Sequence, residues 1–322
     1  MTDKDGVVIP LPGASARRRS PEGGGAGQVV EFTGATAPAE QIPAPAGWEH
    51  RLADGLSFLR RRLAGHYDLD EFGFDRDLAD TVALPTFRLL YEKYFRVEVN
   101  GIENVPRTGP ALLVANHAGG LWPMDAAMTA VAVRAEHPDG RYLRPLGADL
   151  LFATPGAGTL ARRSGATLAC HADADRLLRA GELVGVWPEG FKGIGKRYRD
   201  RYQLQRFGRG GFVRCAITAR APIVPVSIVG SEEIHPVLAN LTPLARLLGL
   251  PYFPVTPTFP WLGPLGLVPL PSKWYLEFGE PIETDQLDAA DPIAVFETTD
   301  LVRETIQTTL YRLLAQRRSI WR

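Results

Sequence analysis

Residues 111–125 run Ala111-Leu112-Leu113-Val114-Ala115-Asn116-His117-Ala118-Gly119-Gly120-Leu121-Trp122-Pro123-Met124-Asp125. The apolar run 111–115 predicts a buried strand, and residues 125–136 predict the helix that follows it. His117 therefore stands where a strand ends, and Asp125 stands in the first turn of the next helix. This arrangement suits a general base and the carboxylate that orients it.

Strand and helix patterns alternate along the rest of the chain from residue 95 onward. We expect strands at 96–100, 111–115, 183–187, 223–229 and 274–278, with helices at 125–136, 148–152, 172–180, 210–219 and 293–318. A loop holding Arg144 is expected after the first of these helices. The alternation predicts an α/β fold, a mixed sheet flanked by helices on both faces. Active sites of such sheets lie beyond the strand ends, where His117 is placed.

The chain divides into three predicted parts. Residues 1–46 are rich in Gly, Ala, Pro and Ser and predict a disordered tail, whose cluster Arg17–Arg19 is either solvated or touches anionic lipid. Residues 47–94 predict an N-terminal helical pair, an amphipathic helix over 48–66 and a second helix over 74–94 that is kinked near Pro85. Residues 95–322 form the main domain.

Composition excludes several classes of function. The 36 basic and 36 acidic residues balance, so the chain has no overall attraction to nucleic acid. The two cysteines predict neither a disulfide framework nor a metal cage, and the six histidines show no ligand spacing, so we expect no metal. The low cysteine count also favours a reducing, cytoplasmic compartment. A polar N-terminus and the lack of an apolar run of about 18 residues favour a soluble or peripheral protein.

Four segments occur in an order and spacing that resemble one family. After Asn116-His117 with Asp125 come Gly158–Arg163, then Val186-Trp187-Pro188-Glu189-Gly190-Phe191-Lys192 with Arg209–Phe212, and finally Val224–Gly230. Over residues 95–285 the chain resembles the glycerolipid acyltransferases of the 1-acylglycerol-3-phosphate acyltransferase type. The resemblance implies a glycerol-phosphate acyltransferase-like fold.

The resemblance also implies a reaction, the transfer of a fatty acyl group from a thioester to a lipid hydroxyl. The donor would be acyl-CoA or acyl carrier protein, acting as a substrate, and no other cofactor is implied. A lipid alcohol is a poor nucleophile at neutral pH, and an imidazole with an ordinary pKa of about 6.5 can remove its proton. His117 is the predicted base, with Asp125 on its far ring nitrogen. No Gly-x-Ser-x-Gly motif points to an enzyme serine instead.

The resemblance further predicts where substrate binds. The predicted substrate-binding residues are Asn116, Glu189, Gly190, Lys192, Arg162, Arg163 and Arg209. A run of bases from Lys192 to Arg209, broken by the single acid Asp200, favours an anion site for an acceptor phosphate or CoA phosphates; a solvated loop is the alternative. Arg162 and Arg163 either meet the acceptor phosphate or lie on a surface helix.

Two departures from the family pattern affect these assignments. The usual pattern has four residues between histidine and aspartate, whereas Asp125 comes three positions later, after a Gly119-Gly120 pair that could bulge. Asp125 could instead serve only the helix dipole, leaving Glu136 or Asp149 as the partner of His117. The usual Thr-Arg after Glu-Gly is replaced by Phe191-Lys192, and lysine does not grip phosphate bidentately.

Residues 242–274 form a very apolar, proline-rich insertion. Its prolines forbid a long helix, and broken backbone cannot span a bilayer. It either dips into a membrane surface, lines an acyl-chain groove or packs as a buried loop. Lipid substrates favour a protein peripheral to the inner face of the membrane, with the membrane surface as a partner.

Three alternatives to a lysophospholipid acyltransferase stay open. The acceptor could be neutral, diacylglycerol or a fatty alcohol, which would fit the loss of Thr-Arg. The protein could be a non-catalytic lipid-binding protein that lost activity through the displaced aspartate. An acyl-ester hydrolase is disfavoured by the missing serine motif.

Overall fold

The computed structural model of the protein describes residues 48–65, 67–118 and 123–321. Residues 47–322 form one compact unit, which contains both the N-terminal helices and the main domain. The predicted tail at 1–46, with its arginine cluster, lies outside the described residues.

A seven-stranded sheet forms the centre, in the order β1-β9-β6-β2-β5-β3-β4. Five neighbouring strands, β6, β2, β5, β3 and β4, are parallel, while β9 is antiparallel to β6 and β1 runs parallel to β9. The bounds are β1 Glu98–Asn100, β2 Ala111–Ala115, β3 Leu143–Gly147, β4 Thr167–Leu168, β5 Leu183–Val186, β6 Ile223–Val229 and β9 Tyr275–Phe278. The predicted mixed α/β fold is therefore confirmed.

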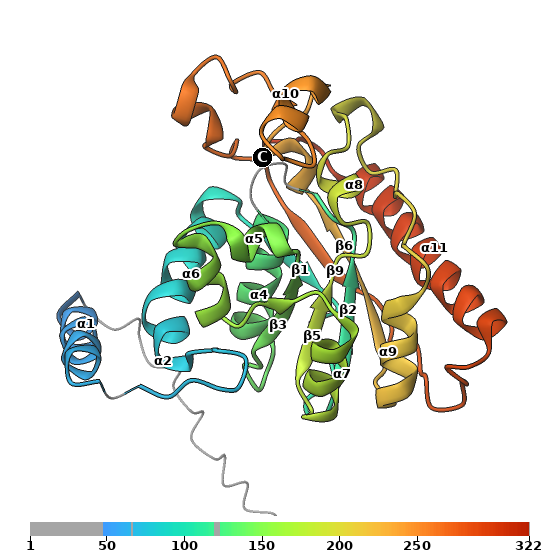
Figure 1. Ribbon diagram of the computed structural model, residues 1–322, viewed down its shortest axis with the longest axis horizontal. Helices are drawn as coiled ribbons and strands as arrows, with labels where there is room; N and C mark the ends of the chain where they lie inside the picture. Colours follow the sequence, from blue (N-terminus) through green and yellow to red (C-terminus); the bar gives the residue numbers. More distant parts are fainter. Residues whose placement is uncertain (1–47, 66, 119–122, 322) are drawn as a thin grey trace, which may run out of the picture. The chain divides into compact units, whose positions relative to one another are not determined.

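The central strand β2 is buried on both faces, as its unbroken apolar sequence requires. Leu112 and Val114 face the core beneath α7 (His171–Arg179), α9 (Gly211–Ala219) and α11 (Pro292–Gln316). Leu113 and Ala115 face the core beneath α4 (Met124–Glu136). Figure 1 shows these helices on opposite sides of the sheet.

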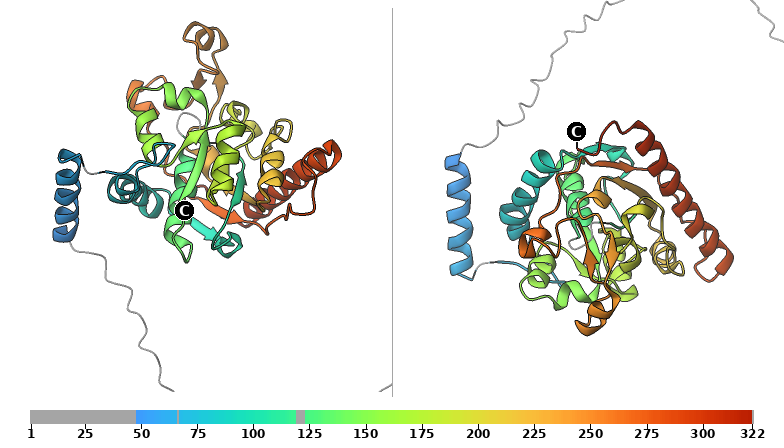
Figure 2. Two further views of the ribbon diagram at one scale, coloured as in Figure 1. Left: turned by 60° about the horizontal axis from the view of Figure 1, so that its bottom comes forward. Right: turned by 90° about the horizontal axis from the view of Figure 1, so that it is seen from above.

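The N-terminal helices cover the α4 side. Helix α1 spans Trp48–Leu63, and a continuous helical run follows as α2 (Arg76–Leu78), η1 (Ala79–Ala83), α3 (Leu84–Leu89) and η2 (Leu90–Tyr94). Both views of Figure 2 show α1 beside this run, which separates it from the sheet. Near Pro85, where the sequence predicts a kink, the helix contains a π-type turn, in which Leu84 N–H bonds Ala79 O just before the proline.

The segment around Arg144 corrects an expectation, because the predicted loop is strand β3. The guanidinium of Arg144 is fully buried and forms ion pairs with Asp70 (2.8 Å) and Glu182 (3.5 Å). It also lies over the rings of Phe72 and Phe74. A buried arginine interrupts the apolar pattern that identifies strands in a sequence, and its partners come from distant segments.

Shorter elements complete the chain. They are η3 Ile102–Asn104, α5 Asp149–Ala153, α6 Ala157–Arg163, α8 Phe191–Ile194, η4 Tyr198–Asp200, η5 Ser231–Glu233, β7 Ala239–Asn240, α10 Thr242–Leu247, β8 Pro254–Val255 and η6 Gly263–Leu267. The β7–β8 pair is a separate antiparallel ribbon. Among the described residues, every helix is too short or too polar to cross a bilayer.

Candidate active site

His117 and Asp125 meet at the carboxyl end of β2. The Nδ1 atom of His117 lies 2.6 Å from Oδ2 of Asp125, and the carboxylate is fully buried in the first turn of α4. The same oxygen accepts the backbone N–H of Ala118 at 2.9 Å. The longer spacing therefore still brings the two predicted residues into contact. The predicted Gly119-Gly120 bulge lies outside the described residues.

Asn116 fixes the strand end on which His117 stands. Its side-chain amide donates to Ile228 O (3.0 Å), and its Oδ1 accepts Ile228 N–H (2.7 Å). The amide thus joins β2 to its neighbour β6 just beyond the last ladder pair, and it is fully buried. A predicted substrate-binding residue is engaged here by the protein's own backbone.

Glu189 fixes the same histidine from the other side. It follows β5, and its Oε1 accepts the backbone N–H of His117 at 2.9 Å while Oε2 accepts that of Gln205 at 2.7 Å. Lys196 lies 3.4 Å from Glu189 Oε2 and 3.1 Å from Oε1 of Glu232, with all three side chains almost completely buried. The carboxylate therefore positions the backbone of His117.

Lys196 is shared between the carboxylates of Glu189 and Glu232, and this buried setting changes the pKa of Glu232. Burial raises the pKa of Glu232 to about 7, and the nearby charge of Glu189 adds to the increase, while Lys196 opposes it. Lys196 belongs to the run of bases that the sequence predicts as an anion site. Because its ammonium is buried between carboxylates, it is not available to a phosphate.

Helix α8 packs directly on the histidine. Gly190 begins it with φ 55° and ψ −143°, a conformation that requires glycine. A Cβ atom on Gly193 would lie 2.6 Å from His117 O and 2.8 Å from the Cβ of Glu189. Gly193 therefore allows a close approach between α8 and His117 that any other residue would prevent.

Two aromatic residues border the site. The Trp187 ring lies 6.1 Å from the His117 ring, and its buried Nε1–H has no hydrogen-bond partner among the described residues. Tyr252, from the proline-rich insertion (residues 242–274), lies against Gly195 at the end of α8. Burial, together with the charge of Asp125, raises the pKa of Tyr252 well above its ordinary value.

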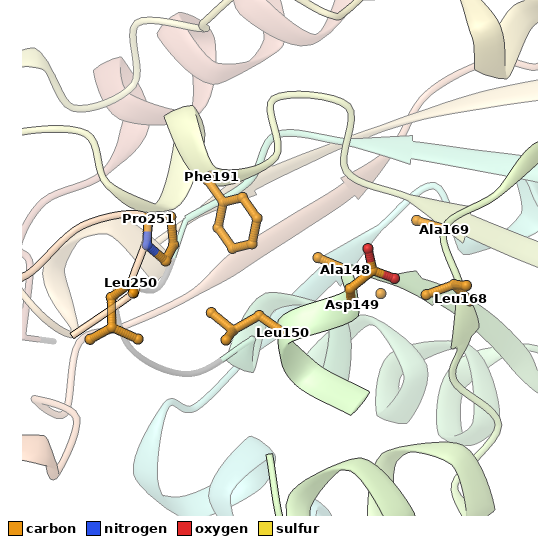
Figure 3. Close-up of a pocket in the computed structure, with 10 residues that line it drawn as sticks. Ala148, Asp149, Leu150, Leu168, Ala169, Phe191, Leu250 and Pro251 are labelled. Carbon is orange, nitrogen blue, oxygen red and sulfur yellow. The ribbon is translucent and has the colours of Figure 1, made fainter. Parts of the chain in front are cut away.

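A pocket of about 550 Å³ with both polar and apolar atoms in its wall lies beside α8 (Figure 3). It is formed where β3 and β4 end, by α8 and by the insertion, with lining residues Gly147, Ala148, Asp149, Leu150, Leu168, Ala169, Phe191, Gly249, Leu250 and Pro251. Phe191, Leu150 and Leu250 gather at one side of it, and Asp149 supplies a carboxylate at the other. The pocket therefore lies at the sheet edge that carries His117.

The predicted basic residues are dispersed. Lys192 is exposed on α8, and Arg209 is exposed just before α9. Arg162 stacks over Phe152 at 4.7 Å, and Arg163 lies over Tyr67 at 5.9 Å. The contacts of these two arginines are with α5 and the N-terminal segment, which favours a packing role over contact with the acceptor.

Sequence reasoning did not assign Lys196, Gly193, Glu232, Gln205 and Tyr252. Lys196 was present in the run of bases, and Gly193 follows Glu189-Gly190 in the same motif. Nothing in the sequence distinguishes a buried lysine from its exposed neighbours in a basic stretch. The others come from segments that are distant along the chain.

The His117–Asp125 pair lies beyond the central strand of this mostly parallel sheet, which is where α/β enzymes carry their active sites. The family model described as Acyltransferase matches residues 96–229. Uncharacterized proteins of Mycobacterium tuberculosis and Mycobacterium leprae are both 60% identical to the chain over 267 residues, which is 82% of this chain and 74% and 72% of theirs.

Two further relatives carry names that describe an activity. The "DGAT1/2-independent enzyme synthesizing storage lipids" of Homo sapiens is 28% identical over 198 residues, 61% of this chain and 57% of that protein. The crystal structure of the 1-acyl-sn-glycerophosphate acyltransferase PlsC from Thermotoga maritima superposes with a TM-score of 0.50 and 18% identity, covering 84% of this chain and 99% of that one.

Residues 96–229 therefore form an acyltransferase-family domain, and the fold is that of PlsC. The resemblance indicated by the four sequence segments is thereby confirmed, and the protein is an O-acyltransferase.

Proposed function

We propose that the protein transfers a fatty acyl group from acyl-CoA or acyl carrier protein to a glycerolipid hydroxyl, with His117 as general base. The observation that carries the proposal is the 2.6 Å contact between His117 Nδ1 and the buried Asp125. That contact keeps the proton on Nδ1 and leaves Nε2 as the basic nitrogen.

The reaction follows from this tautomer. His117 Nε2 removes the proton of the acceptor hydroxyl as its oxygen attacks the thioester carbonyl. The tetrahedral intermediate collapses, the carbon–sulfur bond breaks, and the imidazolium returns the proton to the departing thiolate. An ester and a free thiol result, and Asp125 stabilises the imidazolium while it exists.

A lysophospholipid is the acceptor we favour. Its phosphate is matched by exposed bases on and after α8, Lys192, Arg197 and Arg199, and an acyl chain suits the side of the pocket where Phe191, Leu150 and Leu250 gather. This proposal makes the protein peripheral to the inner, cytoplasmic face of a membrane, where such acceptors lie.

A neutral acceptor, diacylglycerol or a fatty alcohol, is the second candidate. It is favoured by the likeness to a protein whose name describes storage-lipid synthesis, and by Phe191-Lys192 in place of Thr-Arg. The non-catalytic alternative loses its basis, because it depended on an aspartate displaced from His117 and the two are in contact.

The test is acyl transfer by the purified protein from labelled acyl-CoA, or from acyl carrier protein, to a panel of lysophospholipids, diacylglycerol and fatty alcohols. His117→Ala is the control. Transfer to lysophospholipids that disappears in the variant supports the proposal, whereas transfer to neutral acceptors alone would establish the second candidate. Equal activity in the variant would exclude His117 as the base.

A further inference from the structure

The proline-rich insertion displays large apolar side chains to solvent. Leu247, Trp261 and Leu265 are 80%, 73% and 72% exposed. Leu248, Leu262 and Val268 are also mostly exposed. A concentration of exposed apolar side chains in one segment of a folded protein indicates a surface that binds a protein, a membrane or a ligand.

This exposure belongs to an ordered scaffold. One lobe is α10, held on the β7–β8 ribbon by Leu241 N–H to Phe253 O and by Phe253 N–H to Asn240 Oδ1, both at 2.9 Å. The second lobe surrounds η6 and is closed by Thr258 Oγ1 to Gly266 O at 3.2 Å. Each lobe therefore presents its apolar side chains on a hydrogen-bonded backbone.

The second lobe is also fastened to the domain. Leu270 N–H bonds Ile234 O at 2.8 Å, and His235 Nε2 lies 3.1 Å from Leu267 O. In Figure 1 both lobes lie at the end of the sheet that carries α8. The exposed side chains consequently lie at the same end of the domain as His117.

Exposed basic residues adjoin the apolar lobes. Arg197 and Arg199 flank Tyr198, whose N–H bonds Val237 O at 2.8 Å, immediately before β7. Arg246 lies on α10 itself. The exposed apolar side chains Leu247, Trp261 and Leu265, here called the tips of the insertion, thus lie beside guanidinium groups. This combination is complementary to a bilayer surface, which has a hydrocarbon interior and phosphate charges in its headgroup region.

The insertion also forms a wall of the pocket beside α8. Leu250 and Pro251 line that pocket together with Phe191, and Tyr252 lies against Gly195. One segment thus carries both the exposed apolar tips and the pocket wall. A lipid that leaves a bilayer contacted by the tips would meet the pocket next.

We propose that the tips of the insertion, Leu247, Trp261 and Leu265, enter the headgroup region of a bilayer that contains anionic phospholipid, and so bring the pocket to the lipid surface. The inference rests on the proposed function. A bilayer suits the tips better than a protein partner, because they lie on two separate lobes and include a tryptophan, a residue favoured at membrane interfaces.

The test is flotation of the full chain with vesicles of phosphatidylcholine, with and without phosphatidylglycerol. The variant Leu247→Ser/Trp261→Ser/Leu265→Ser should bind mixed vesicles about 100-fold more weakly. The matched control is Ile293→Ser/Phe296→Ser/Leu301→Ser, which removes three exposed apolar side chains from α11 and should bind as wild type does. Thermal unfolding of both variants verifies that they are folded.

Two further measurements address the geometry and the charge. Lipids brominated near the glycerol backbone should quench more fluorescence in the wild type than in Trp261→Phe. The variant Arg197→Gln/Arg199→Gln should lose about tenfold in binding to vesicles with phosphatidylglycerol and almost none to those without it.

Several outcomes would overturn the inference. The folded insertion variant could bind vesicles as tightly as the wild type does, or the α11 control could lose as much binding as the insertion variant. The wild-type protein could also fail to bind vesicles and instead self-associate through the insertion. Binding is measured without turnover. A protein that floats with vesicles through the insertion but transfers no acyl group would contradict the proposed function alone.

Discussion

The sheet edge around His117 and the proline-rich insertion are neighbours built in opposite ways. Around the histidine, the side chains of Asn116, Asp125 and Glu189 are buried, and each forms at least two hydrogen bonds with other groups of the protein. In the insertion the largest side chains lie in water. A base must be held rigidly before substrate arrives. A docking surface must stay accessible until its partner arrives.

The largest expected effect comes from the carboxylate behind the base. Asp125→Asn should lower kcat by about 10²- to 10⁴-fold, because the wrong tautomer of His117 would be favoured. Steady-state acyl transfer measures the loss. Glu136→Gln, at the far end of α4, should change kcat little; an equal loss there would mean that Asp125 has no special relation to His117.

Next comes the buried lysine. Lys196→Met should lower the free energy of unfolding by about 3 kcal/mol or more, because it leaves Glu189 and Glu232 buried without their counter-charge. Urea unfolding measures the change. The matched variant Lys192→Met, four positions away and exposed, should stay within about 0.5 kcal/mol of wild type. Similar losses in both would refute the buried ion-pair network.

Helix α8 provides a test of rigidity at the histidine. Gly193→Ala should reduce kcat by roughly 10- to 100-fold, since its methyl group would displace His117 or α8. Gly55→Ala in α1, where an added Cβ atom meets nothing within 4 Å, is the control and should leave kcat unchanged. Full activity in Gly193→Ala would show that the site tolerates movement and would weaken the contrast between the two regions.

The pKa of Glu232, raised mainly by burial, also predicts a pH dependence of stability. Between pH 4.5 and about 7 the folded protein keeps the proton of Glu232 while the unfolded chain has lost it. The folded state then binds more protons, so this contribution to stability is complete below pH 4.5 and is lost as the pH rises to about 7.

Glu232→Gln should remove that contribution. Relative to the variant, the wild type should lose roughly 1 to 3 kcal/mol across this interval and show a constant difference above it. Urea unfolding at several pH values makes the measurement. Parallel stability curves would contradict the raised pKa of Glu232.

The smallest expected effect compares one residue type in the two settings. Trp261→Ser, at the exposed tip of the insertion, should change the free energy of unfolding by less than about 0.5 kcal/mol. Trp274→Ser, in the core beside Phe95, should cost about 3 kcal/mol or more. A large loss at Trp261 would mean that the insertion is part of the core.

Some features could be predicted because they depend on local pattern. The apolar run 111–115 is buried wherever it lies, so it identifies the central strand, and His117 must then stand at its end. The order of the four segments was enough to indicate the family. The His117–Asp125 partnership was predicted against an unusual spacing, and the structure forms the contact.

Other features depended on distant segments. Arg144 interrupts an apolar pattern, and only Asp70, Glu182 and the Phe72 and Phe74 rings make its burial in a strand possible. Asn116 could equally face a substrate; its bonds to Ile228 depend on β6 lying beside β2. Arg162 and Arg163 share a motif with the site in sequence, but packing places them against other elements.

The sequence by itself determined the strand–helix alternation, the family resemblance and the pairing of His117 with Asp125, because apolar periodicity and motif chemistry act over a few neighbouring residues. Tertiary structure alone decided that Lys196 is buried between two carboxylates while Lys192 is exposed, and that the insertion both walls a pocket and exposes its tips. Burial depends on which segments meet in space. Tertiary contacts between distant segments decide which charges are paired and which side chains are exposed, so the local sequence pattern cannot predict either.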